Sequence, residues 1–108
     1  MKTSRRVMYL RDLKGMPVGC VAISLNKDRT QIRYQLSVLN PVDKFERDLA
    51  RHIAYGRLLE KPVRIPADSN WKKFDITAEV MVDIFHSKTT PARAKRAARL
   101  WMDDNGVS

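Results

Sequence analysis

Residues 16–41, MPVGCVAISLNKDRTQIRYQLSVLNP, decide the fold, because the hydrophobic pattern changes here from that of strands to that of a helix. Within 30–39, apolar and polar residues alternate, which is the pattern of a strand with one buried face. Residues 16–25 alternate similarly, and 26–29, Asn-Lys-Asp-Arg, are typical of a turn. We therefore expect an antiparallel β-hairpin or, if 5–10 pair with it, a three-stranded sheet.

A helix is predicted directly after the hairpin. Asn40 is a favourable cap residue, Pro41 suits the first helical position, and Asp43 lies three residues after the cap. Apolar residues then recur at helical spacing over 41–59. Pro62 ends the pattern, since proline cannot continue a helix. The hairpin is expected to pack on this helix.

The second half of the chain predicts a loop and a helical pair. Residues 60–74 are rich in turn formers, with a candidate short strand at 63–65. Helices are expected at about 76–86 and 91–102. Strands followed by helices, without a βαβ repeat, indicate an α+β fold. With 108 residues, the chain is expected to form a single domain.

The composition is that of a folded, strongly basic protein. The chain is 44% hydrophobic and 31% charged, and 21 Lys and Arg against 12 Asp and Glu give a net charge of +9. A single cysteine, Cys20, cannot form an internal disulfide, which favours a reducing compartment. No apolar run reaches the ~18 residues of a membrane span, and no secretory pattern is present. We expect a cytoplasmic protein with no membrane partner.

The positive charge is concentrated in two segments. Residues 1–14 carry five basic residues against one aspartate, and 88–101 carry five basic residues and no acidic one. Such charge favours nucleic acids or acidic proteins as partners. If the two segments meet in space, they form one basic surface.

The stretch PARAKRAARLW, residues 91–101, predicts an amphipathic helix. Its small residues and Trp101 fall on one side, and its cations fall on the other. The cationic face suits phosphates or carboxylates. The candidate binding residues of the two basic segments are Lys88, Arg93, Lys95, Arg96, Arg99, Arg5 and Arg6.

A second candidate binding element is the loop before the helical pair. Trp71 lies in a polar stretch next to Lys72 and Lys73, and interface hot spots favour Trp. Pro66 belongs to the same loop, whose X–Pro bonds suit a docking element. The alternative is that Trp71 folds back over the edge of the core.

The last two helices have the lengths of a helix-turn-helix motif, with 87–90 as the break. Reading of base edges usually needs Asn, Gln, Ser or Thr among the cations. The outward positions here are Lys and Arg among alanines, so the signal for sequence-specific recognition is weak.

No arrangement of residues predicts catalysis, a metal or a cofactor. His52 and His86 are the only histidines and stand alone, and His52 is expected to be half-buried in the structure. Cys20 is expected to be core packing. With four glycines and no phosphate loop, we expect a non-enzymatic protein.

Residues 19–58, GCVAISLNKDRTQIRYQLSVLNPVDKFERDLARHIAYGRL, resemble small accessory (early-gene) proteins of tailed bacteriophages. The resemblance implies a protein acting inside a bacterial host on replication, recombination or defence, and it implies no catalytic residues. The matching positions are Tyr34, Leu36, Ser37, Asn40, Pro41, Asp43, Phe45, Ile53, Ala54, Gly56, Arg57 and Leu58.

Three hypotheses follow. The first is a phage accessory protein that binds and modulates a host nucleic-acid-processing machine, such as an anti-nuclease directed against the RecBCD exonuclease or a recombination modulator. The second is direct, non-specific DNA or RNA binding by the basic C-terminal helix. The third is a helix-turn-helix transcription regulator. Direct backbone binding would weaken steeply with salt.

Overall fold

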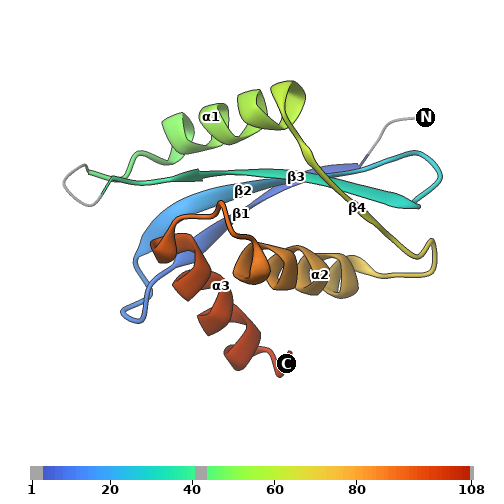
Figure 1. Ribbon diagram of the computed structural model, residues 1–108. Coiled ribbons are helices and arrows are strands. Elements are labelled where there is room, and N and C mark those ends of the chain that lie inside the picture. Colours follow the sequence, from blue (N-terminus) through green and yellow to red (C-terminus); the bar gives the residue numbers. More distant parts are fainter. Residues whose placement is uncertain (1–3, 41–43, 108) are drawn as a thin grey trace.

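The computed structural model describes residues 4–40 and 44–107, and it confirms an α+β fold (Figure 1). Its elements form one four-stranded antiparallel sheet and three helices. In chain order they are β1 (Ser4–Arg11), β2 (Pro17–Leu25), β3 (Gln31–Val38), α1 (Arg47–Glu60), β4 (Val63–Pro66), α2 (Lys73–His86) and α3 (Ala92–Asp104).

The sheet has the simple strand order β1-β2-β3-β4. Residues 5–10 do pair with the hairpin, as part of β1. Between β2 and β3, Asn26 Oδ1 accepts hydrogen bonds from the backbone N–H groups of Thr30 (2.8 Å) and Gln31 (2.9 Å). Arg29 takes a positive φ of 61° in this turn. The turn therefore sets the register in which β3 lies against β2.

Helices cover both faces of the sheet. Figure 1 shows α1 on one face and α2 with α3 on the other. The large side chains Val21, Ile23 and Leu25 of β2 belong to the main core, which α2 and α3 cover. A small core lies under α1; its buried residues are Cys20, Ala22, Ala50, Ala54 and Leu58. Alternation of side chains along β2 thus separates a bulky face from a face of small residues.

The helix bounds differ from those expected. α1 begins at Arg47, not near residue 41, and Phe45 instead packs edge-on against the Tyr9 ring at 5.9 Å between centroids. The contact between Phe45 and β1 holds this segment outside the helix. Pro41 and Asp43 lie outside the described residues, so their expected capping roles are not seen.

The stretch 60–74 is not entirely a loop, because residues 63–66 form β4, which pairs with β3. α2 begins at Lys73 rather than 76, since Asp75 accepts a hydrogen bond from the Lys72 N–H at 2.9 Å and closes an earlier first turn. α3 runs from Ala92 to Asp104. Among the described residues, none of the helices combines the length and hydrophobicity needed to cross a bilayer.

Candidate functional site

The basic face of α3 is partly engaged in contacts within the protein. Ala94, Ala97 and Ala98 are buried, as the amphipathic pattern predicts. Arg93 donates a hydrogen bond to the Leu39 carbonyl oxygen at 2.6 Å. Arg99 forms an ion pair with Asp103 at 3.1 Å. Two of the five predicted cations of this segment therefore make contacts within the protein.

The remaining cations of this segment are Lys88, Lys95 and Arg96. Within the described part of the chain, none of the three side chains has a hydrogen-bond or ion-pair partner. Arg96 and Lys88 are exposed, and Lys95 is half-buried. α3 thus offers a narrower cationic face than its sequence indicates.

The other six predicted site residues lie at the end of the sheet where β1 begins and β4 ends. Arg6 donates hydrogen bonds to the Lys73 carbonyl oxygen (3.2 Å) and to Thr77 Oγ1, so β1 is joined to the start of α2. Arg29 donates to the Trp71 carbonyl oxygen at 2.9 Å. The six are Arg5, Arg6, Pro66, Trp71, Lys72 and Lys73.

Trp71 lies half-buried against the main core. Of the two interpretations of this tryptophan, the structure shows the one in which it folds back over the core edge. The exposed apolar ring in this region is instead Phe74, with 51% of its surface accessible. It lies 5.8 Å, between centroids, from the ring of Trp101 on α3.

Arg5 and Arg93, one from each basic segment, lie at opposite ends of the sheet, whereas Arg11 of the first segment lines a cavity together with residues of α3. Arg5 is level with Ser24, and Ser24 is level with Arg33 on β3. Arg93 binds Leu39, six residues further along the chain from Arg33. At about 3.3 Å per residue this separates the two places by about 20 Å. Arg5 and Arg93 therefore do not share one surface.

A row of arginines crosses the sheet on the side covered by α1. Arg5 on β1 pairs with Ser24 on β2, Ser24 pairs with Arg33 on β3, and Arg33 pairs with Arg64 on β4. Residues directly opposite each other point to the same face. We call these four residues the arginine row. They line a cavity of about 140 Å³, together with Leu58, Leu59 and Pro62.

The arginine row is unfavourable for stability on its own. Arg33 and Arg64 are like charges directly opposite each other on antiparallel strands, an arrangement that destabilises a sheet. No carboxylate lines the cavity, and the Arg33 Nε atom is buried without a hydrogen-bond partner among the described residues. A buried donor without an acceptor costs about 1–3 kcal/mol. This chemistry fits an anion.

A second basic cavity, of about 280 Å³, opens at the same end of the sheet. Arg5, Arg6, Arg29 and Lys73 line it, again without a carboxylate, and burial lowers the pKa of Arg6. Because Arg5 lines both cavities, they meet at the β1 edge. We call the cations of the two cavities, together with Lys72 next to Lys73 in the chain, the sheet-end basic surface; it comprises Arg5, Arg6, Arg29, Arg33, Arg64, Lys72 and Lys73.

Sequence reasoning missed Arg29, Arg33 and Arg64. Arg33 is one of the polar residues that alternate along β3. This pattern predicts that Arg33 points away from the main core, but it does not predict which residues Arg33 faces. Arg64 fell in a segment expected to be mostly loop. Only the pairing of β4 with β3 brings these two side chains together.

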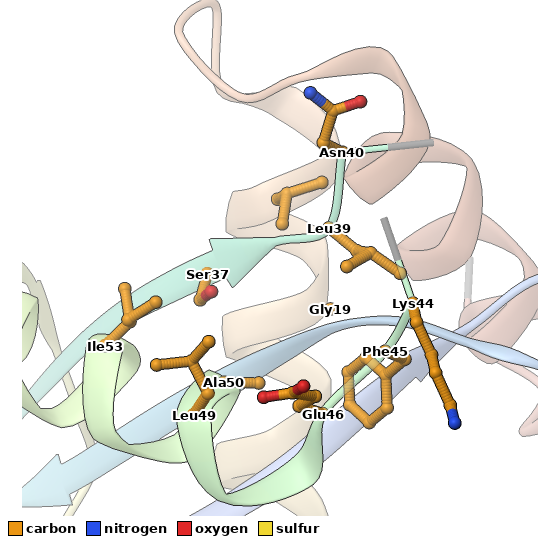
Figure 2. A pocket seen from close by; sticks show the side chains of 11 residues that line it. Gly19, Ser37, Leu39, Asn40, Lys44, Phe45, Glu46, Leu49, Ala50 and Ile53 are labelled. Atoms are coloured by element: carbon orange, nitrogen blue, oxygen red, sulfur yellow. The ribbon is translucent and has the colours of Figure 1, made fainter. Parts of the chain in front are cut away.

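A larger cavity, of about 430 Å³, lies where the ends of β2 and β3 meet the start of α1. Figure 2 shows Leu49 and Ile53 of α1 facing Ser37 of β3 across it. Its lining is mostly apolar, with Lys44 and Glu46 as the charged residues among those described. Its lining includes Asn40 and Lys44, between which the chain is outside the described residues, so we assign it no ligand.

The histidines and the cysteine lie apart from these surfaces. His52 is exposed on α1, so the expectation that it is half-buried is wrong; it lies on the outward side of a helix that contacts the sheet through Ala50 and Ala54. Cys20 is fully buried, as expected. Across residues 4–40 and 44–107, no group of three His, Cys, Asp or Glu side chains is placed to hold a metal ion.

Comparison of the chain with protein-family models, with curated proteins and with solved structures found no match.

Proposed function

We propose that the protein binds nucleic acid directly, through contacts between phosphates and the sheet-end basic surface. The observation that carries the proposal is the meeting of six cations from β1, β3, β4, α2 and the β2–β3 turn, around two cavities that no described carboxylate lines. A buried arginine Nε without an acceptor adds to it. The surface differs from the C-terminal helix that the sequence indicates for the same activity.

The side chains of this surface favour backbone contacts over reading of base edges. Arginine and lysine provide charge-assisted hydrogen bonds to phosphate oxygens. Apart from Ser24, no Ser, Thr, Asn or Gln of residues 4–40 and 44–107 lines the cavities to address bases. We therefore expect binding that depends little on sequence.

Fluorescence anisotropy with labelled DNA and RNA oligonucleotides tests this proposal. Affinity is expected to fall steeply as salt rises, because phosphate contacts release counterions. Arg29→Gln and Arg64→Gln are expected to weaken binding of all sequences alike. Arg51→Gln, on the exposed side of α1, makes the same charge change and is the matched control. Absence of binding at low salt, or equal effects of all three variants, would contradict the proposal.

A second candidate is the phage accessory protein that modulates a host nucleic-acid-processing machine. The observation in its favour is the exposed ring of Phe74, which lies against Trp101 of α3. Arg96 is exposed on the same helix. Exposed aromatic rings and arginines are typical of protein interfaces.

A pulldown with the tagged protein from bacterial lysate, with and without nuclease and at moderate salt, tests this second candidate. A discrete protein that survives nuclease and is lost with Phe74→Ala would support it. Recovery of nucleic acid alone would contradict it.

A further inference from the structure

We propose that the arginine row is a binding site for a phosphate monoester, namely the terminal phosphate of a nucleic-acid strand. This inference rests on the proposed function and adds the chemical group that the row recognises. Under it, the sheet-end basic surface tracks the backbone while the row holds the end of the strand.

The shape of the site favours an end over a continuous backbone. The row lies in a half-open cavity of about 140 Å³, which Leu58 and Leu59 of the last turn of α1 and Pro62 also line. A phosphodiester is followed by sugars on both sides, whereas a terminal phosphate needs an opening on one side only. A half-open cavity therefore suits a terminal group.

The spacing of the arginines suits a group with three free oxygens. Neighbouring strands lie about 4.8 Å apart, so Arg33 is next to Arg64 and about 10 Å from Arg5 across β2. Arginine side chains are long enough to converge over this distance, and each can donate two parallel hydrogen bonds to phosphate. The Ser24 hydroxyl lies between them on the same row.

The charge of the site points the same way. Arg5, Arg33 and Arg64 bring three positive charges, and no carboxylate of the described residues lines the cavity to neutralise them. A phosphate monoester carries about −1.5 to −2 at pH 7, and an internal phosphodiester carries one negative charge. The dianion balances more of the repulsion between Arg33 and Arg64.

The rim of the cavity offers a place for the first nucleoside. Leu59 lines the cavity and is 77% exposed. Its apolar surface, beside the charged row, can contact a terminal sugar or base. Leu59 is thus explained as part of the site rather than as an isolated exposed leucine.

The test compares two oligonucleotides of one sequence, one with a 5′-phosphate and one with a 5′-hydroxyl, on the full-length chain at a single salt concentration. We expect the phosphorylated strand to bind about tenfold tighter. Arg33→Gln and Arg64→Gln are expected to remove this ratio, Arg64→Lys to retain part of it, and Arg51→Gln to leave it unchanged. Arg64 is exposed on an edge strand, so its variants test the site without disturbing the core.

The outcomes separate this inference from the proposed function. Equal, salt-sensitive binding of both strands would overturn the terminal-phosphate site and leave direct nucleic-acid binding standing. Failure of both strands to bind would overturn both. In a second arm, inorganic phosphate is titrated while backbone amides are followed by NMR. Shifts confined to Ser24, Arg33 and Arg64 are expected, and shifts spread evenly over the basic residues would overturn the site.

Discussion

Tyr34 on β3 donates a hydrogen bond to Asp83 on α2, with 2.5 Å between the tyrosine Oη and the carboxylate Oδ2. The tyrosine is 2% exposed, so its ring crosses the main core and ties the sheet to the helix. We expect Tyr34→Phe to lower the free energy of unfolding by about 1.5–3 kcal/mol, because hydrogen bonds to charged acceptors are among the stronger ones. Urea denaturation measures this. Tyr9→Phe, whose hydroxyl has no recorded partner in the described residues, is the control, and equal losses in both would contradict the prediction.

Stability is expected to fall at alkaline pH. Burial raises the pKa of the Cys20 thiol to about 11. Burial, followed by the hydrogen bond to Asp83, raises the pKa of Tyr34 well above its ordinary value. Because both pKa values are raised in the folded state, the stabilisation is complete below the pKa values of the unfolded state, about 8.5 for cysteine and 10 for tyrosine. It is lost as pH rises beyond them towards the folded pKa values. Urea denaturation between pH 7 and 11 should show the decline beginning near pH 9. Cys20→Ala should remove the part of this decline that begins near pH 9, and Tyr34→Phe should remove the part above pH 10. If neither variant changes the pH profile of stability, these two groups do not cause the decline.

Two glycines are expected to respond oppositely to alanine. A Cβ on Gly19 of β2 would lie 2.6 Å from the Ser37 carbonyl oxygen, so β2 and β3 would have to shift. We expect Gly19→Ala to lower the free energy of unfolding by about 1–3 kcal/mol. A Cβ on Gly56, exposed within α1, meets nothing within 4 Å, so Gly56→Ala is expected to raise stability by up to about 1 kcal/mol. Thermal melting of the pair checks the signs.

Removal of one arginine from the row is expected to stabilise the fold. Arg64→Thr relieves the repulsion with Arg33 and places a β-branched residue in β4, which is worth about 0.2–1 kcal/mol. The same change should weaken oligonucleotide binding. Urea denaturation and anisotropy on one preparation measure both effects. A variant that is less stable and binds as well as the parent would show that Arg64 serves the fold.

The cations of α3 are expected to differ in their effect on stability. Arg93→Ala removes the hydrogen bond to the Leu39 carbonyl oxygen and should cost about 1–2 kcal/mol. Arg96→Ala removes an exposed side chain and should change stability by less than about 0.5 kcal/mol. Chemical denaturation checks the pair. If the two variants are equally stable, the Arg93 contact contributes nothing in solution.

The local pattern predicted much of this fold because each strand of the hairpin has one bulky face. Alternation around Tyr34 defined β3, and the alanines of α3 pointed inward as the helical period requires. The start of α1 was wrong because Phe45 contacts Tyr9, a residue far away in the sequence. β4 was predicted only as a candidate strand at 63–65 within a loop, because four residues carry too little pattern to be separated from a loop.

The candidate site was predictable only in part, because it depends on strand register. The sequence indicated four of its cations because they are adjacent in the chain, namely Arg5 with Arg6 and Lys72 with Lys73. Arg33 and Arg64 were not indicated, since each is a single cation in its own segment. Their neighbourhood follows from pairing of β3 with β4, which one sequence does not specify.

The core under α1 is smaller than the core under α2 and α3, and this difference affects how easily α1 separates from the sheet. α1 rests on alanines and a cysteine, whereas α2 brings Ile76, Val80, Met81 and Ile84 to the sheet. Local opening should therefore release α1 long before α2, and its amides should exchange with deuterated water sooner. Because Leu58 near the end of α1 also lines the cavity of the arginine row, an anion bound there would slow the opening of α1.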